Sequence, residues 1–278
     1  MQKGKILALI VLFGAICAMG YANVKLYQAQ QLYMEGNASY DDLAARIRWM
    51  PPRTSPTTPS AEKSEKSETT GTAPENGGKA KDPYPEHSFG IPPLEINFPA
   101  LRKVNQDASA WLYSPNTVID YPVMAASDYQ YYLDHLPDGA RNANGSLFID
   151  YNNAPDFGDP LTIVYGHHMK SGAMFGSLKG YKSQSYFEQH PRMYLYTPRG
   201  NYRIDLMYGF VIGAELWREK SFMYSENLDA LMLYGARNST FISDVRRGEG
   251  DRIVALSTCS YEFNEARYVL LGLLVEES

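Results

Sequence analysis

Ile253-Val-Ala-Leu-Ser-Thr-Cys259 is an apolar run that ends in a cysteine, and a polar stretch separates it from Arg267 and a second apolar run, Tyr268–Val275. Two such runs joined by the polar segment Ser260–Ala266 predict a β-hairpin. In a hairpin with these ends, Cys259 and Arg267 face each other across the base of the loop. A fixed positive charge beside a thiol favours the thiolate, so the pattern predicts a reactive cysteine.

A nucleophilic cysteine usually needs a proton acceptor, because a free thiol has a pKa near ~8.5 and is only a few per cent ionised at neutral pH. The candidate is His167, which follows the strand-like run Leu161–Tyr165 and Gly166. Residues just beyond strand ends are where a rigid scaffold commonly presents catalytic groups. His168 is expected to point the other way and to be a loop or supporting residue. A buried cysteine or a solvated arginine alone is ordinary, and it is the combination of the three residues that favours a catalytic site.

These residues resemble the active-site motifs of sortases. Leu256-Ser-Thr-Cys259, with Arg267 downstream, is similar to the sortase signature TLxTC followed by an arginine. Ile163-Val-Tyr-Gly-His167-His-Met-Lys-Ser-Gly-Ala-Met-Phe-Gly is similar to the histidine segment of class B sortases of Gram-positive bacteria. Ala255 departs from the signature, which has its first threonine there, and we expect altered packing rather than lost chemistry.

The resemblance continues in the correct order through most of the chain, from about Leu94 to Val275. Further matching blocks begin at Asp107, Ile119, Tyr131, Gly145 and His190.

The expected fold is mainly β. Many short strands with Gly, Pro and Asn turns and little helix indicate a closed barrel or a sandwich. The resemblance implies a closed eight-stranded sortase-type β-barrel with additional helices. The sequence places strands at Trp111–Tyr113, Val118–Val123, Leu147–Ile149, Leu161–Tyr165, Met193–Thr197 and Tyr202–Ile212, besides the two of the hairpin. Helical patterns lie at Phe98–Asn105, Tyr129–Leu133, Phe175–Tyr181 and Leu228–Tyr234.

The activity implied by the resemblance is that of a cysteine transpeptidase. Cys259 would attack the carbonyl after the threonine of a C-terminal sorting signal of the Pro-x-Thr type, and His167 would move the protons. Arg267 would stabilise the oxyanion, and Ser257 and Thr258 are possible supporting residues. The implied partners are secreted proteins that carry the signal and an amino acceptor, either a cell-wall precursor such as lipid II or a pilin lysine.

Two other classes of protein stay open at this point. A papain-like cysteine peptidase would use the same thiol and imidazole but would only hydrolyse its substrate. A non-catalytic surface module would use the barrel merely to bind peptides.

Composition narrows the partners. A formal net charge of −5 argues against a nucleic-acid partner, which would need a basic face. The two cysteines, Cys17 and Cys259, lie in very different contexts, so no disulfide framework is expected. Adjacent histidines and one cysteine without spaced ligand pairs offer poor metal geometry. We therefore expect neither a metal nor a cofactor.

The N-terminal third predicts three segments before the catalytic domain, residues 94–278. Residues 1–24 predict a signal-anchor transmembrane helix, because lysines precede the apolar run Ile6–Val24 and its about 19 residues can span a ~30 Å hydrocarbon core. The lysines place the N-terminus inside, which gives a single-pass protein of the cell membrane with an extracellular catalytic domain. A cleaved signal peptide is the alternative, since Gly20-Tyr-Ala22 resembles a cleavage site.

Residues 25–50 predict a juxtamembrane helix, with a possible break at Gly36-Asn37 and a new N-cap at Ser39. The sequence leaves open whether this helix packs on the domain or extends from the membrane. Residues 51–93 are rich in Pro, Ser, Thr, Lys and Glu and predict a linker.

Overall fold

The computed structural model describes residues 2–49, 94–218, 228–259 and 264–277, with the side chains of residues 2–10 left aside. The predicted linker at residues 51–93 lies outside the described part of the chain. All elements and contacts below belong to the described residues.

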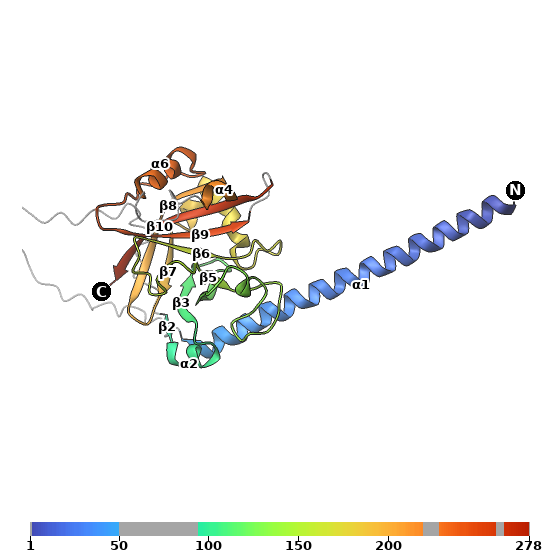
Figure 1. Cartoon of the computed structure of the whole chain (residues 1–278), viewed down its shortest axis with the longest axis horizontal. Coiled ribbons are helices and arrows are strands. Elements are labelled where there is room, and N and C mark those ends of the chain that lie inside the picture. Colours follow the sequence, from blue (N-terminus) through green and yellow to red (C-terminus); the bar gives the residue numbers. More distant parts are fainter. Residues whose placement is uncertain (1, 50–93, 219–227, 260–263, 278) are drawn as a thin grey trace, which may run out of the picture.

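Eight strands close into a barrel in the order β10-β8-β7-β3-β4-β5-β6-β9 (Figure 1). Their bounds are β3 Ala108–Tyr113, β4 Asp120–Ala125, β5 Leu147–Ile149, β6 Leu161–Tyr165, β7 Arg192–Tyr196, β8 Asn201–Gly213, β9 Arg252–Cys259 and β10 Ala266–Glu277. The predicted closed eight-stranded β-barrel is confirmed. Most neighbours run antiparallel, but β4 pairs with β5 and β6 with β9 in parallel. A parallel pair brings two strand C-termini to the same edge, which matters for the site below.

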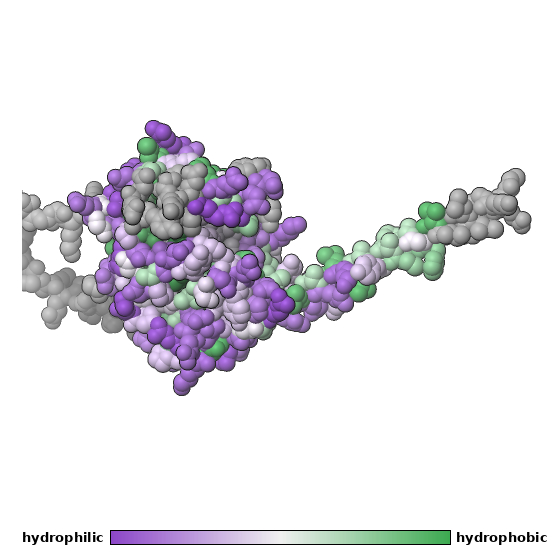
Figure 2. Space-filling model, viewed as in Figure 1, coloured by the Kyte–Doolittle hydropathy of each residue, from purple (hydrophilic) through white to green (hydrophobic). Residues whose placement is uncertain are grey.

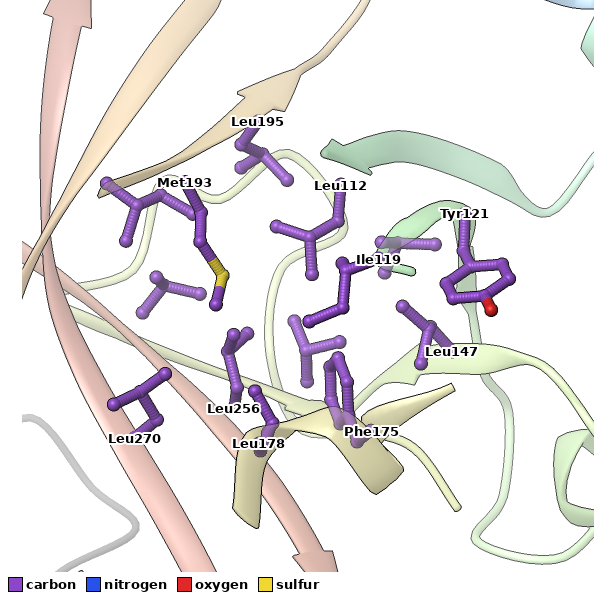
Figure 3. Packing of buried hydrophobic residues seen from close by; sticks show 14 of the residues in the cluster. Leu112, Ile119, Tyr121, Leu147, Phe175, Leu178, Met193, Leu195, Leu256 and Leu270 are labelled. Carbon is purple, nitrogen blue, oxygen red and sulfur yellow. The ribbon is translucent and has the colours of Figure 1, made fainter. Parts of the chain in front are cut away.

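Strand alternation divides the apolar side chains of the barrel into two clusters. Residues such as Leu112, Met193, Leu256 and Leu270 point into the barrel, where they pack against one another (Figure 3). The alternate residues of β6, β9 and β10 join a second cluster on the outer face, together with Trp217 and residues of the helix that begins at Leu228. Both faces of these three strands are therefore covered by apolar packing, which fixes their register.

Short helices pack against the barrel, and one of them contributes Phe175 and Leu178 to the inner cluster (Figure 3). They are α2 Phe98–Val104, α3 Gln184–Gln189, α4 Ala214–Trp217 and α6 Leu228–Asn238, with 3-10 turns η2 Tyr131–Leu133 and η3 Phe175–Lys182. The four predicted helical segments are confirmed, with the segments at 131–133 and 175–182 as 3-10 helix. α3 and α4 are not predicted by the sequence, because each is too short to show a helical period.

The N-terminal segment forms one helix, α1, from Gln2 to Ile47, which extends away from the barrel toward its N-terminus (Figure 1). The predicted break at Gly36-Asn37 and the new N-cap at Ser39 are therefore wrong. Gly36 is buried against the barrel, where a Cβ atom would lie 2.5 Å from Nδ2 of Asn144, so close packing explains a glycine in mid-helix. The C-terminal half of α1 packs on the domain, which answers the question that the sequence left open.

Among the residues that the structure describes, no helix holds a stretch both long enough and apolar enough to cross a membrane.

Candidate active site

Cys259 and Arg267 lie opposite each other at the loop end of the β9–β10 hairpin. Their Cα atoms are partners in the antiparallel register, as the hairpin pattern predicts. Ala255 and Val269 belong to the outer cluster, so alternation places Cys259 and Arg267 on the outer face as well. Side chains directly opposite on one face of an antiparallel pair have Cβ atoms about 5 Å apart. Cys259 is a free, exposed thiol, so an extended substrate can reach it.

The Arg267 guanidinium contacts the two residues that precede it in the chain. Nη1 donates to the carbonyl of Ala266 at 3.1 Å, and Nη2 lies 3.6 Å from the carboxylate of Glu265. The Arg267 side chain is about a quarter exposed, with 26% of its surface accessible, whereas Glu265 is 63% exposed. An ion pair this open is weak, and a bound substrate can compete for the guanidinium.

His167 reaches the same edge from β6. The parallel register pairs Tyr165 with Ser257, and the amide of Gly166 donates to the carbonyl of Ser257 at 3.2 Å. Gly166 is the last residue held in this ladder, so His167 follows the C-terminal end of β6, next to the strand β9 that ends with Cys259. Cys259 and Arg267 thus lie at the ends of β9 and β10, and His167 lies in the loop that follows the neighbouring strand β6.

The two imidazoles have different partners in this structure. Nε2 of His167 lies 2.5 Å from the carbonyl oxygen of Leu133, and among the described residues no hydrogen bond joins this ring to the Cys259 thiol. Nδ1 of His168 lies 2.7 Å from the carbonyl oxygen of Cys259. His168 therefore does not point away from the nucleophile as expected. The chain leaves the ladder after Gly166 and forms an isolated bridge between His168 and Met174, so simple strand alternation no longer applies.

The buried carboxylate of Asp150 links the end of β5 to the end of β6 through hydrogen bonds. Asp150 is 2% exposed and follows β5. Its oxygens accept hydrogen bonds from the hydroxyls of Tyr165 at 2.9 Å and Tyr129 at 3.0 Å, and from the amide of Asn152 at 2.9 Å. Burial and the negative charge of Asp150 raise the pKa of Tyr165 and Tyr129 far above the usual value, so both phenols stay protonated and donate.

The possible supporting residues Ser257 and Thr258 are both buried, at 1% and 3% exposure. Neither hydroxyl has a hydrogen-bond partner among the described residues. By alternation Ser257 faces the outer cluster and Thr258 the barrel interior. Their supporting role stays a prediction.

The sequence predicts no role for Asp150, Tyr129 or Leu133. A signal for Asp150 was present, because it is an acidic residue directly after the apolar run Leu147–Ile149, where β5 ends. Nothing in the sequence could show that the Leu133 carbonyl receives the His167 ring, since this contact spans 34 residues.

No group of three or more His, Cys, Asp or Glu side chains within the described ranges is arranged to hold a metal ion.

Comparison with models of protein families finds no match for this chain. Among curated proteins, sortase B of Listeria monocytogenes is 33% identical over 178 residues, which cover 63% of this chain and 72% of that protein. Sortase B of Staphylococcus aureus is 27% identical over 184 residues, which cover 65% of this chain and 75% of that protein. Among solved structures, a Staphylococcus aureus sortase B–substrate complex aligns with a TM-score of 0.60 at 27% identity, covering 66% of this chain and 86% of that chain.

Proposed function

Because this chain belongs to the sortase B family of cysteine transpeptidases, we propose that Cys259 is its nucleophile, His167 its general acid and base, and Arg267 its oxyanion donor. The observation that carries this proposal is the convergence of β6, β9 and β10 at one edge. The support is an exposed thiol opposite Arg267 in the β9–β10 pair, with His167 following the adjacent strand β6.

The reaction divides into two acyl transfers. The Cys259 thiolate adds to the carbonyl carbon of the threonine in the sorting signal. The bond from this carbon to the nitrogen of the next residue then breaks, which leaves a thioester. His167 gives its proton to the departing amine. It then takes a proton from the incoming amine, which attacks the thioester and releases the thiolate. Arg267 donates to the oxygen that carries the negative charge in both tetrahedral intermediates.

The choice of His167 over His168 rests on the sortase motif, in which the histidine directly follows a glycine, as His167 follows Gly166. His168 contacts the backbone carbonyl of Cys259, a position suited to holding the strand end rather than to taking the thiol proton. The Leu133 carbonyl engages Nε2 of His167, so Nδ1 is the nitrogen that would exchange protons with the thiol and the amines. Catalytic hydrogen bonds are often long or absent before the substrate binds, so this apo contact does not exclude the role.

The proposed substrates are secreted proteins with a C-terminal sorting signal of the Pro-x-Thr type, such as the NPQTN-like signals typical of the family. The proposed acceptor is the amino group of a cell-wall precursor such as lipid II. Transfer to a pilin lysine or to water would change only the second half of the reaction.

We also propose that α1 anchors the enzyme in the cell membrane as a single-pass helix, with the barrel outside. The support is the apolar run Ile6–Val24 behind Lys3 and Lys5. The described side chains in the N-terminal half of α1 are exposed and largely hydrophobic, whereas the face of the barrel in view is mainly hydrophilic (Figure 2).

The test is a fluorogenic sorting peptide offered with and without triglycine as the amine, with products identified by mass spectrometry. We expect a ligated product, which Cys259→Ala abolishes. Loss of one oxyanion donor typically costs about 10²–10³ in rate, so Arg267→Ala should fall by that factor, and Arg267→Lys should also be poor because it lacks the planar fork. Hydrolysis without ligation at saturating amine would favour a peptidase, and full activity of Cys259→Ala would refute the nucleophile.

The two histidines are separated by parallel variants. His167→Ala should lose turnover, while His168→Ala should keep most of it. The reverse pattern would transfer the base to His168.

A further inference from the structure

The C-terminal half of α1 is built into the barrel along one face. The buried residues Gly36, Tyr40, Leu43, Ala44 and Ile47 recur every three or four positions, which is the spacing of one helix face. The residues between them are mostly exposed. This part of the helix is therefore packed on the domain rather than standing free between membrane and enzyme.

The chain leaves α1 and returns to the barrel at the same place. β1, Arg48–Trp49, pairs with β2, Glu95–Ile96, in an antiparallel ladder. The amide of Asn97 also donates to the carbonyl of Ile47 at 2.9 Å. Backbone hydrogen bonds thus join the residues on either side of the segment 50–93. The contact between α1 and the catalytic domain does not depend on that segment.

The loop of residues 142–146, which precedes β5, forms hydrogen bonds with α1. Nδ2 of Asn142 donates to the carbonyl of Leu32 at 2.8 Å, and Nδ2 of Asn144 donates to Oδ1 of Asn37 at 2.9 Å. The hydroxyl of Tyr40 donates to the carbonyl of Gly145. Asn142 and Asn144 are nearly fully buried, so a side chain at position 36 would have to break the hydrogen bonds that hold them.

The same segment is hydrogen-bonded to the residues on either side of Leu133, which contacts His167. The amide of Ser146 donates to the carbonyl of Tyr132 at 2.8 Å, and the amide of Asn142 donates to the carbonyl of Asp134 at 2.9 Å. Between these two anchor points lies Leu133, whose carbonyl faces Nε2 of His167.

A second route runs from the helix to the loop that follows the histidines. The rings of Tyr40 and Tyr121 meet edge to face at 5.0 Å, and the amide of Met174 donates to the hydroxyl of Tyr121 at 3.3 Å. Ala173 and Ala44 line one cleft between this loop and the helix. α1 is therefore linked both to the carbonyl that contacts His167 and to the loop that follows the two histidines.

We propose that the docked part of α1, residues 32–49, is a permanent part of the catalytic unit that positions His167, and that packing rather than the segment 51–93 holds the barrel to the helix. Gly36 and Tyr40 are then positioning residues, acting through residues 131–146. This inference rests on the proposed role of His167 only for its effect on turnover. The barrel is then held in one orientation relative to α1 instead of hanging from a long linker.

The first experiment cuts the connection. A site for a sequence-specific protease is inserted within residues 51–93 of the full chain in detergent, and the cut protein is analysed by size-exclusion chromatography. We expect the two fragments to co-elute and the cut enzyme to keep the turnover of the uncut chain. Separation of the wild-type fragments would overturn the proposal. Because co-elution needs no catalysis, this result stands even if the chain proves inactive on every sorting peptide.

The second experiment loosens the helix. Tyr40→Ala and, independently, Gly36→Gln should release the fragments and lower kcat by about tenfold or more at unchanged KM, because small displacements of a catalytic group are costly. Ala38→Gln, on the exposed side of the same helix, is the matched control and should behave as wild type. Released fragments with normal kcat would refute the positioning role, and equal release by Ala38→Gln would refute the specific interface.

Discussion

The substitution Gly166→Ala tests whether side-chain packing at the end of β6 sets the position of His167. A Cβ atom there would lie 2.4 Å from Cδ2 of Leu147 and 2.7 Å from Cδ2 of Phe175. Optimal carbon contacts are about 3.5–4.0 Å, so each neighbour must retreat by roughly 1 Å. Both neighbours are fully buried, and overpacking of this kind costs about 1–3 kcal/mol.

We expect two measurable consequences of Gly166→Ala. The melting temperature should fall by about 2–4 °C for each kcal/mol of lost stability in a domain of this size. The backbone that carries His167 must shift, and a 1 Å misplacement of a catalytic group can cost about 10² in rate. A peptide-cleavage assay at a temperature well below the transition should therefore show kcat/KM reduced by about 10–10².

Gly200→Ala is the control for this substitution. Its Cβ atom would meet the nearest atom, Oε1 of Glu276, at 3.7 Å, an ordinary contact far from the β6 end. Both stability and kcat/KM should stay near wild type. A Gly166→Ala variant with a lowered melting temperature but full kcat/KM would show that the packing of β6 does not set the position of His167.

Three further results are expected. Asp150→Asn places an amide where hydroxyl and amide donors meet, so denaturant unfolding should show a loss of about 1–3 kcal/mol per unsatisfied group; an unchanged midpoint would mean that Asp150 does not brace the strand ends. Burial raises the pKa of Tyr40 above its usual 10.0, so stability should be full below pH 10 and should fall above it as the unfolded state loses the proton first. Each such group contributes a slope of about 1.4 kcal/mol per pH unit to the free energy of unfolding. Tyr40→Phe should remove the contribution of one group, as measured by chemical unfolding between pH 8 and about 11. Glu265→Gln should change kcat/KM by less than about fivefold, because an exposed ion pair is worth about 0–1 kcal/mol; a loss near 10² would instead give this carboxylate a part in holding Arg267 during the reaction.

The strands around the site were predictable because they are short, apolar and bounded by turn residues. The sequence places Leu147–Ile149 and Leu161–Tyr165 at the bounds that the structure has. The Cys259–Arg267 pairing was also predictable, since the two ends of a hairpin are local in sequence. Local hydrogen bonding and alternation are sufficient for these features.

Contacts between distant segments were not predictable. The sequence indicates helix for residues 25–50, but Gly36 reads there as a break, and only the buried Asn142 and Asn144 opposite it explain why the helix continues. The partners of the two histidines follow the same rule, since the carbonyls of Leu133 and Cys259 lie 34 and 91 residues from them.

The amino-acid sequence by itself determined the barrel strands, the three residue types of the site and the order in which they occur. These follow from side-chain periodicity and from motifs that are continuous along the chain. The tertiary structure alone decided which imidazole touches which carbonyl, and that α1 is docked on the loops beneath His167. The physical reason is that packing depends on the shape of two surfaces at once, and a single stretch of sequence holds only one of them.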